Sequence, residues 1–262
     1  MLHYDTVAGP EASRALLVLH GILGRGKNWR SLARRLARAM PGWAVVLVDL
    51  RLHGASRHVT GPHDLASAAR DLDAVADALP FPVAAVAGHS FGGKVALTWA
   101  ATRAAMPVIL LDSSPAARPE QEGKGAVGAV FRALDAAPGP FPDRGSFVNA
   151  IRGQGIDEPV ARWLALNLVN DEAGHRFGVN LVGARALLHD YYRADLWDLV
   201  ADQPASFSLV ATRSDVHRSE DVARLRELLG ERLRNVPAAH WLHVDAPDAT
   251  LDQLVSVLAA LS

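Results

Sequence analysis

The sequence predicts an α/β protein built on a doubly wound, mostly parallel sheet. Short apolar runs recur along the chain, and amphipathic helical patterns lie between them. The runs are continuously apolar rather than alternating, which is typical of strands buried on both faces of a parallel sheet. Strands that alternate with helices indicate βαβ units, and therefore an open sheet with helices on both faces.

Six segments have the composition of buried strands, and most of them end at a glycine or at polar residues. They cover residues 15–20, 44–50, 82–87, 107–111, 206–212 and, more weakly, 233–237. Helices are predicted over residues 29–40, 64–79, 91–105, 220–229 and 249–261. Their apolar residues are three or four positions apart, as Leu32, Leu36 and Met40 are in the first helix, which is the spacing of one helical face.

One long segment breaks this alternation. Between residue 115 and about residue 201 no strand pattern is visible, and residues 116–127 are rich in Pro, Gly and Ala. Helical patterns follow at residues 128–136, 146–153, 158–168 and from 183 onward. A helical insertion between two strands is typical of a lid. We therefore expect a core domain of residues 1–114 and 202–262 and a helical lid of residues 115–201.

The composition excludes several kinds of chemistry. The 262 residues contain no cysteine, so disulfides, zinc–thiolate sites and cysteine nucleophiles are excluded. The net charge of −1 gives no basic footprint for nucleic acid. No apolar run approaches the roughly 20 residues that span a bilayer, and the N-terminus does not resemble a signal peptide. We expect a cytoplasmic enzyme with no metal site and no stable membrane insertion.

The strongest local signal is the G-x-S-x-G motif of residues 88–92, which follows a predicted strand and precedes a predicted helix. That context is typical of a nucleophile elbow, a strained turn that projects a serine hydroxyl from the sheet. Neighbours without Cβ relieve the crowding of such a turn. The helix that follows points its N-terminus at the same place, where free N–H groups favour an oxyanion. Ser90 is therefore the predicted nucleophile.

A second glycine-containing loop, residues 20–24 (HGILG), directly follows the first predicted strand. An elbow of this kind takes one oxyanion-hole N–H from the residue after the nucleophile and one from a loop in this place. The predicted donors are the N–H groups of Phe91 and Ile22. Ile22 is preferred to Leu23 because it follows the His-Gly turn directly.

The base and the acid are expected further along the chain, because the order with such an elbow is serine, acid, histidine. His240 lies after the last predicted strand and is favoured by position over His243, three residues on. The acid is left between Asp112, at the end of the fourth strand, and Asp215, after the fifth. Both follow carboxyl ends of strands, where open α/β sheets build their sites.

Four stretches of the chain resemble a known family. They are residues 20–33, 49–56 (DLRLHGAS), 88–96 (GHSFGGKVA) and 240–243 (HWLH). They resemble the α/β-hydrolase esterases that include the bacterial YbfF esterase and abhydrolase-domain-containing protein 11. The resemblance implies hydrolysis of acyl esters or thioesters, without a metal or organic cofactor. It also favours Asp112, because members of this family do not always carry an acid after the fifth strand.

The sequence thus predicts a serine hydrolase that acts on a small-molecule acyl substrate through an acyl-enzyme. A cofactor-free haloperoxidase or a C–C bond hydrolase would use the same residues, and a non-catalytic binding protein is the alternative of a different class. Lid aromatics are candidates for an acyl pocket, although most are expected in the lid core; they are Phe131, Phe141, Phe147, Trp163, Phe177, Tyr191, Tyr192 and Trp197. Candidates to contact a polar leaving group are Arg185, His189 and Arg193, while His53, His58 and His63 are expected at the surface or in the pocket.

Overall fold

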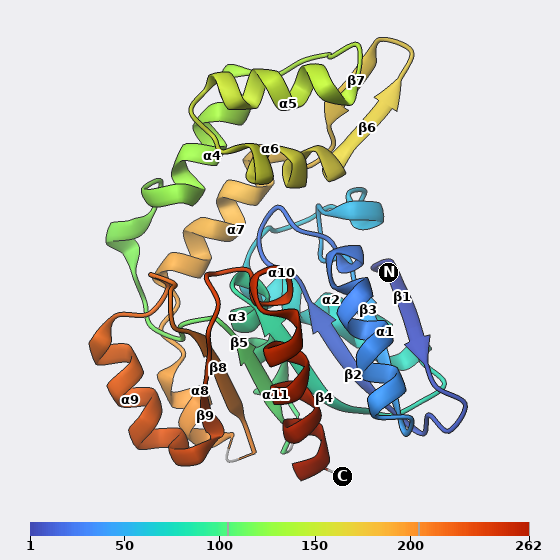
Figure 1. The fold of residues 1–262 in the computed structure, drawn as a ribbon, viewed down its shortest axis with the longest axis vertical. Coiled ribbons are helices and arrows are strands. Elements are labelled where there is room, and N and C mark those ends of the chain that lie inside the picture. The colour runs from blue at the N-terminus through green and yellow to red at the C-terminus, as the bar shows by residue number, and fades with distance from the viewer. Residues whose placement is uncertain (104, 204, 262) are drawn as a thin grey trace.

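In a computed structural model, which describes residues 1–103, 105–203 and 205–261, a twisted sheet lies between two layers of helices and a further helical layer covers one end (Figure 1). Within these residues the main sheet has seven strands in the order β1-β3-β2-β4-β5-β8-β9. Their bounds are Tyr4–Ala8 (β1), Arg14–Leu19 (β2), Trp43–Val48 (β3), Val83–His89 (β4), Val108–Leu111 (β5), Phe207–Ala211 (β8) and Leu233–Val236 (β9). All neighbours are parallel except β1 and β3. The predicted doubly wound, mostly parallel sheet is confirmed.

The strand β1 is absent from the six predicted runs. It pairs antiparallel with β3 at the edge of the sheet, and its side chains are exposed or only half-buried. A five-residue strand of this kind lacks the continuous apolar run that is typical of the buried strands. Its existence therefore depends on the neighbouring strand rather than on its own composition.

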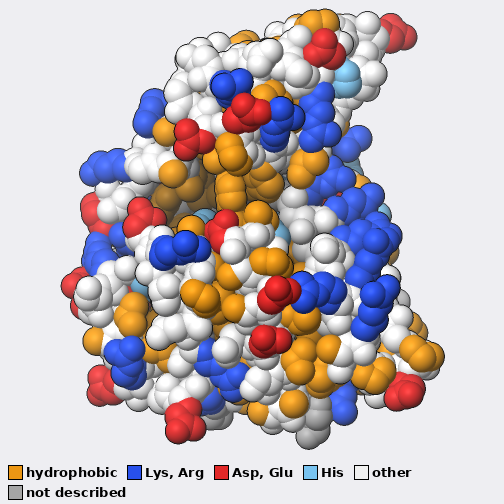
Figure 2. Space-filling view, viewed as in Figure 1, with side chains coloured by type: hydrophobic (Ala, Val, Ile, Leu, Met, Phe, Trp, Pro, Cys, Tyr) orange, Lys and Arg blue, Asp and Glu red, His pale blue; other side chains and the backbone are white. Residues whose placement is uncertain are grey.

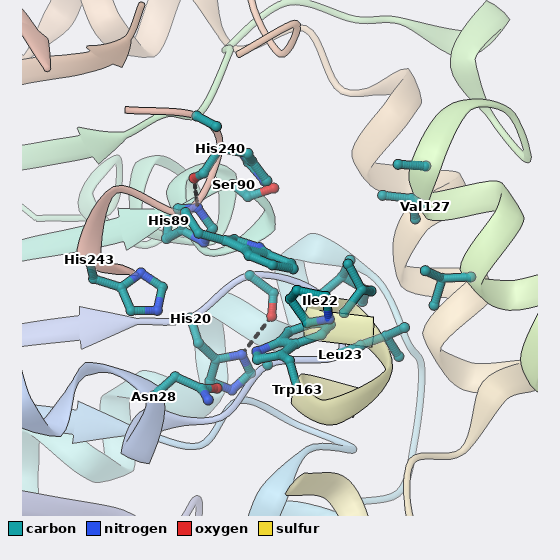
Figure 3. Close-up of a pocket in the computed structure, with 18 of the residues that line it drawn as sticks. His20, Ile22, Leu23, Asn28, His89, Ser90, Val127, Trp163, His240 and His243 are labelled. Atoms are coloured by element: carbon teal, nitrogen blue, oxygen red, sulfur yellow. Dashed lines mark hydrogen bonds between the residues drawn. The ribbon is translucent and has the colours of Figure 1, made fainter. Parts of the chain in front are cut away.

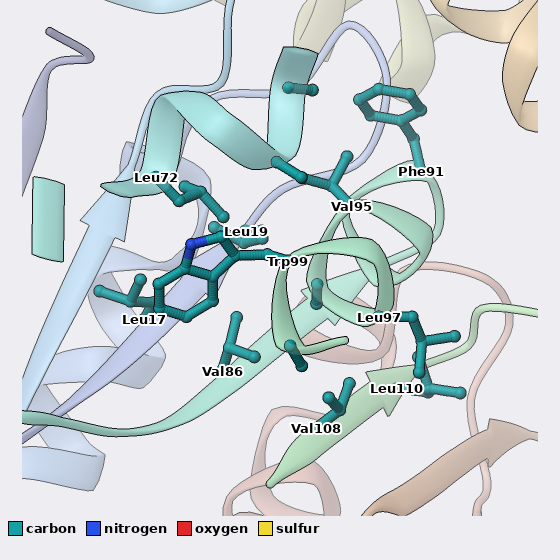
Figure 4. Packing of buried hydrophobic residues seen from close by; sticks show 14 of the residues in the cluster. Leu17, Leu19, Leu72, Val86, Phe91, Val95, Leu97, Trp99, Val108 and Leu110 are labelled. Atoms are coloured by element: carbon teal, nitrogen blue, oxygen red, sulfur yellow. The ribbon is translucent and has the colours of Figure 1, made fainter. Parts of the chain in front are cut away.

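Successive side chains of the central strands bury on opposite faces of the sheet, as the twofold period of a strand requires. Leu17 and Leu19 of β2 face a core with α2 (Leu65–Ala78) and α3 (Phe91–Ala100) (Figure 4). Leu16 and Val18 face the opposite core with α1 (Arg30–Ala39) and α11 (Pro247–Ala260). Helices thus cover both faces, which explains why the strands are continuously apolar.

The segment between β5 and β8 forms the layer above the sheet (Figure 1). Its residues 115–201, the predicted insertion, are called the lid segment below. Its helices are α4 (Gly125–Ala136), α5 (Arg144–Gly153), α6 (Glu158–Leu164), α7 (Leu181–Arg193) and α8 (Trp197–Asp202). Its buried residues, such as Phe147 and Leu164, form a third hydrophobic cluster. Trp197 of α8 packs instead in the cluster beneath α2 and α3, so the last helix of the segment lies against the sheet.

The expectation of no strand in this segment is wrong. A hairpin joins β6 (Leu168–Asp171) to β7 (Gly174–Phe177). Each strand has only four residues and is at most half-buried, so neither gives an apolar run. Gly174 has φ of +120°, a conformation that glycine adopts without strain at such a turn.

The remaining elements agree with their predicted positions to within a few residues. The helix predicted over residues 91–105 ends at Ala100, and residue 104 of that prediction lies outside the described residues. Two helices near the C-terminus are α9 (Ser219–Leu229) and α10 (Leu242–Asp245). Short 3-10 turns are η1 (Gly26–Trp29), η2 (Gly54–Ser56), η3 (Pro119–Gln121), η4 (Ala165–Asn167) and η5 (Gly230–Arg232). No helix in the described part of the chain combines the length and the apolar character needed to cross a membrane.

Candidate active site

Ser90 is the single residue between the end of β4 and the start of α3. Its φ of +51° and ψ of −117° lie in a region that residues with a Cβ rarely adopt. Three hydrogen bonds hold the turn: the Ser90 N–H donates to Leu111 O at 3.1 Å, and the Ser90 carbonyl accepts from Gly93 N–H at 2.9 Å and from Ser113 Oγ at 2.6 Å. The geometry is that of a nucleophile elbow.

The glycines around Ser90 are required by close contacts between three segments. A Cβ on Gly88 would overlap the carbonyl of Gly92, and a Cβ on Gly93 would overlap the Ser113 hydroxyl. A Cβ on Gly92 would lie 2.6 Å from the carbonyl oxygen of His20, where β2 ends. These contacts explain the spacing of the motif, because any larger side chain would push α3 away from the sheet.

The structure brings Asp112 to His240. The His240 Nδ1 lies 2.7 Å from Asp112 Oδ2, and the carboxylate is fully buried at the end of β5. The other oxygen, Oδ1, accepts a hydrogen bond from the N–H of Ala211 at 3.1 Å. An Nδ1–H that donates to the carboxylate leaves Nε2 of the neutral ring with a free lone pair, which is the form that a general base needs.

Asp215 lies in the exposed loop after β8, and its main-chain carbonyl accepts from Arg118 at 3.4 Å. Among the described residues its carboxylate makes no hydrogen bond with His240.

The same loop supplies a residue that sequence reasoning missed. The His217 side chain is 3% exposed, and its Nε2 lies 3.7 Å from Asp112 Oδ1. Burial lowers the pKa of His217, while the nearby Asp112 charge acts in the opposite direction.

Ser90 and His240 line the same cavity, and their side chains lie next to each other in Figure 3. The His240 side chain is one-third exposed, so it faces the cavity while its Nδ1 reaches the buried acid. His89 supports this loop, because its Nε2–H donates to the His240 carbonyl at 2.8 Å and the two rings lie 4.6 Å apart. Burial is the main cause that holds the pKa of His89 well below its usual value. Charge repulsion from the nearby His240 lowers it further.

Two main-chain N–H groups are available as oxyanion donors. In the loop after β2, Leu23 N–H donates to His53 Nε2 at 3.0 Å and Gly24 N–H donates to Gly21 O at 3.0 Å. By contrast, the N–H groups of Ile22 and Phe91 donate to no acceptor within the described residues. Both residues line the cavity beside Ser90. The arrangement favours Ile22 over Leu23 as the donor from this loop.

Two buried histidines hold the loop of residues 20–24 in place. The His20 Nε2 accepts from Leu50 N–H at 3.0 Å, so its Nδ1–H donates to Gly21 O at 2.7 Å. His53 is fully buried, which makes its expected place at the surface or in the pocket wrong, and its Nδ1–H donates to Arg51 O at 2.7 Å. Burial is the main cause that lowers the pKa of His20 to about 4 and the pKa of His53 to about 3. Both rings are therefore neutral near pH 7.

The D-x-R-x-H-G-x-S stretch supports the same loop. Asp49 Oδ1 accepts from Gly26 N–H at 2.8 Å, and its Oδ2 accepts from Ala55 N–H at 2.9 Å. The Arg51 guanidinium binds the Asp71 carboxylate through two hydrogen bonds of 2.7 and 3.0 Å. The Asp49 and Arg51 side chains of this stretch therefore stabilise the loops around the site rather than line its cavities.

Two cavities meet at Ser90, and Figure 2 shows the hollow between the lid segment and the sheet domain. One cavity, of about 470 Å³, is mainly apolar; its lining includes Leu23, Trp29, Val130, Val160, Trp163 and Trp241. The other, of about 320 Å³, is more polar; its lining includes Arg118, Gln121, Lys124, Tyr191, Tyr192 and Asp215. Ile22, Ser90 and His240 line both. A substrate at Ser90 would thus meet an apolar wall on one side and a polar wall on the other.

The other sequence candidates have mixed positions. His243 lines the apolar cavity and stacks on Trp29 with ring centroids 4.1 Å apart, and burial lowers its pKa to about 4.

Of the lid aromatics, Phe131, Phe141, Phe147 and Phe177 pack with the lid core. Arg185 pairs with Asp135, while His189 and Arg193 pair with Glu122 on the exposed surface. His58 is exposed and His63 half-buried. Within the described ranges, no group of three or more His, Asp or Glu side chains is arranged to hold a metal ion.

The close approach of α3 to β2 gives a first prediction. Gly92→Ala should lower the free energy of unfolding by about 2 kcal/mol, because the new Cβ meets main-chain atoms that cannot move aside. Gly42→Ala is the matched control, since nothing lies within 4 Å of the position that its new Cβ would take. Urea denaturation of both variants measures the difference. Equal stability of the two variants would contradict the packing described.

The neutral buried histidines predict a loss of stability in acid. Because the pKa of His20 falls from 6.5 to about 4 on folding, the unfolded chain binds more protons between these values. The stabilisation is therefore complete above pH 6.5 and declines as the pH falls towards 4, by on the order of 3 kcal/mol for His20. His53→Gln removes one such group and should flatten the dependence of unfolding free energy on pH by about 1.4 kcal/mol per pH unit. An unchanged slope in this variant would show that His53 is already charged in the folded protein.

Comparisons with known proteins show what the whole chain is similar to. A family model described as the alpha/beta hydrolase fold matches residues 14–127. The sn-1-specific diacylglycerol lipase ABHD11 of Danio rerio is 26% identical over 268 residues, covering 99% of this chain and 82% of that protein. Esterase YbfF of Escherichia coli (strain K12) is 27% identical over 262 residues, covering 94% of each chain.

Solved structures share the whole architecture. A marine microorganism esterase superposes with a TM-score of 0.79 at 22% identity, covering 98% of both chains. A thioesterase domain from the curacin biosynthetic pathway gives a TM-score of 0.69 at 24% identity, covering 97% of this chain and 94% of that one. At these identities the structural likeness establishes the fold. The chain has the α/β-hydrolase fold and resembles, over nearly its whole length, the group of proteins that includes YbfF and ABHD11.

Proposed function

We propose that this protein is a serine hydrolase that cleaves acyl esters or thioesters through Ser90, His240 and Asp112. The proposal rests on one observation above all: a fully buried carboxylate lies 2.7 Å from Nδ1 of an imidazole that shares a cavity with a serine on a strained turn. The similarity to proteins named esterase and lipase supports the same chemistry.

In the proposed reaction, the lone pair of His240 Nε2 takes the proton of the Ser90 hydroxyl as Oγ attacks the acyl carbonyl carbon. The carbonyl oxygen becomes an oxyanion, which the free N–H groups of Ile22 and Phe91 stabilise. His240 then gives its proton to the departing alcohol or thiol, and an acyl-Ser90 ester remains. Water activated by the same imidazole cleaves this ester and restores the serine.

Asp112 stabilises the positive charge that develops on His240 during both steps. Its carboxylate is buried, so the attraction is screened little by solvent. The N–H of Ala211 satisfies the other oxygen, which fixes the orientation of the carboxylate without neutralising it. The N-terminus of α3 begins directly after Ser90 and adds a favourable dipole for the oxyanion.

The apolar cavity supports a substrate with an apolar acyl group. Trp163 of α6 and Trp241, beside the proposed base, have ring centroids 5.4 Å apart and line the same wall. Trp163 belongs to the lid segment and Trp241 to the sheet domain. The pocket is therefore complete only when these two parts lie together. Transfer of apolar acyl surface into such a cavity is favourable by about 25 cal/mol per Å².

The nucleophile is tested by replacing the Ser90 hydroxyl. A fluorophosphonate probe should label the native protein at Ser90, and Ser90→Ala should abolish labelling. Hydrolysis of p-nitrophenyl esters of increasing acyl length should fall at least roughly a thousandfold in the variant. Unchanged circular dichroism serves as the control for folding. Full hydrolysis by the variant would refute the proposed function.

The acid is tested by paired amide substitutions. Asp112→Asn should lower kcat by roughly 10³–10⁴-fold, because the amide no longer stabilises the imidazolium and favours the wrong tautomer. Asp215→Asn is the matched comparison at the exposed loop and should lower kcat by no more than about tenfold. Steady-state kinetics with one ester substrate measure both. A larger loss in the Asp215 variant would assign the acid to that loop instead.

A further inference from the structure

Lys94 is a buried cation that the proposed reaction does not use. It lies on α3, one turn after Ser90, and is 1% exposed. Its Nζ donates to three main-chain carbonyls, those of Ala116 at 2.8 Å, Tyr191 at 2.8 Å and Ala194 at 2.7 Å. Within the described residues no carboxylate forms an ion pair with it, although burying an ammonium without a counter-ion is costly. The three N–H bonds of the ammonium are all occupied.

The three carbonyls belong to the two ends of the lid segment. Ala116 lies where the chain leaves the sheet domain after β5, while Tyr191 and Ala194 lie at and just beyond the end of α7, where the chain returns. These ends are also paired with each other, because Leu196 N–H donates to Pro115 O at 2.9 Å and Arg118 N–H donates to Tyr192 O at 2.6 Å. Lys94 therefore fastens both ends of the lid segment to the helix that begins at the nucleophile.

Tyr191 lies between the Lys94 ammonium and the cavity that Ser90 lines. Its ring lies beneath the ammonium, with Nζ 4.6 Å from the ring centroid, and 6.0 Å from the ring of Phe91. It lines the polar cavity together with Ser90. Burial raises the pKa of the Tyr191 hydroxyl, while the nearby positive charge of Arg118 acts in the opposite direction. The phenol is therefore protonated near neutral pH and can act as a hydrogen-bond donor beside Ser90 Oγ.

We propose that Tyr191 is a further residue of the reacting centre and that Lys94 is the positioning residue that keeps it there. This inference rests on the proposed function of Ser90. From its place in the cavity beside Ser90, the Tyr191 hydroxyl donates a hydrogen bond to Ser90 Oγ during the attack on the substrate, and the Oγ proton stays directed to His240. Tyr191 transfers no proton in this role. Lys94 acts only through Tyr191, because its ammonium holds the carbonyl and the ring of that residue at the base of the lid segment.

Tyr191→Phe tests the donor without disturbing the fastening, because the ring and the main-chain carbonyl remain. We expect kcat and the rate of fluorophosphonate labelling to fall about tenfold, with KM and the melting temperature nearly unchanged. Tyr4→Phe removes a phenol hydroxyl on β1, away from the site, and is the matched control. Wild-type rates in Tyr191→Phe would overturn the proposal.

The absence of cysteine in the chain allows a test of the ammonium itself. Lys94→Cys is alkylated under denaturing conditions with 2-bromoethylamine, which restores an ammonium at nearly the original length, or with 1-bromopropane, which gives a neutral side chain of the same size. Both products are refolded beside unmodified native protein that has been through the same steps. We expect the neutral form to label about tenfold more slowly and the cationic form to regain most of the native rate.

Two results would overturn the role of Lys94. One is a neutral form that labels at the native rate. The other is a cationic form that regains the native melting temperature but not the rate. Combining the neutral form with Tyr191→Phe should cost no more rate than either change alone, because both act through one hydroxyl.

Failure of the proposed function would look different, since native protein would then neither be labelled at Ser90 nor hydrolyse esters. In that case hydrogen exchange would still test the fastening. The amides of Arg118 and Leu196, which link the two ends of the lid segment, should exchange faster in the neutral form. Unchanged exchange at these amides would refute the fastening by Lys94.

Discussion

The crowded turn at Ser90 is the constraint on which the rest of the structure depends. The end of β2, the start of α3 and the loop after β5 meet there at distances that only glycine permits at residues 88, 92 and 93. The strain of a positive φ at Ser90 persists because hydrogen bonds from Gly93 and Ser113 hold the Ser90 carbonyl. The same close packing brings three parts of the chain together at Ser90. They are the start of α3 with Phe91, the loop that contains Ile22, and the end of β5, which Asp112 follows.

Around this turn, buried polar groups are satisfied by one another rather than by solvent. Asp49, His20 and His53 bind main-chain N–H groups of two loops, so the loop that carries Ile22 cannot relax without breaking several buried hydrogen bonds. The two histidines accept these hydrogen bonds on Nε2 as neutral rings, with the proton on Nδ1 in each case. Ile22 lies in this held loop and lines the cavity, and its N–H donates to no acceptor within the described residues, as the proposed oxyanion donor requires.

The lid segment is attached to this centre on two sides. Lys94, one turn after Ser90, binds main-chain carbonyls at both of its ends, and Asn167 Nδ2 donates to the Leu23 carbonyl in the loop after β2 at 2.7 Å. The segment also supplies Trp163 to the apolar cavity and Tyr191 to the polar one. Movement of the lid segment would therefore change both cavities and the surroundings of Ser90 together, because its residues line both cavities and Ser90 lies where they meet.

The sequence by itself determined what depends on local pattern: the parallel sheet of buried strands, the glycine-flanked turn at Ser90, and the place of His240 after the last strand. Apolar runs and glycine spacing report the backbone directly, so these features needed no knowledge of the fold. Only the tertiary structure decided which carboxylate lies beside His240, because both Asp112 and Asp215 follow strand ends and the sequence does not give the path of each loop. It also decided that β1 and the β6–β7 hairpin form, that His53 is buried, and that Lys94 reaches the lid segment. Each of these depends on contacts between residues far apart in the chain, which periodicity and composition do not encode.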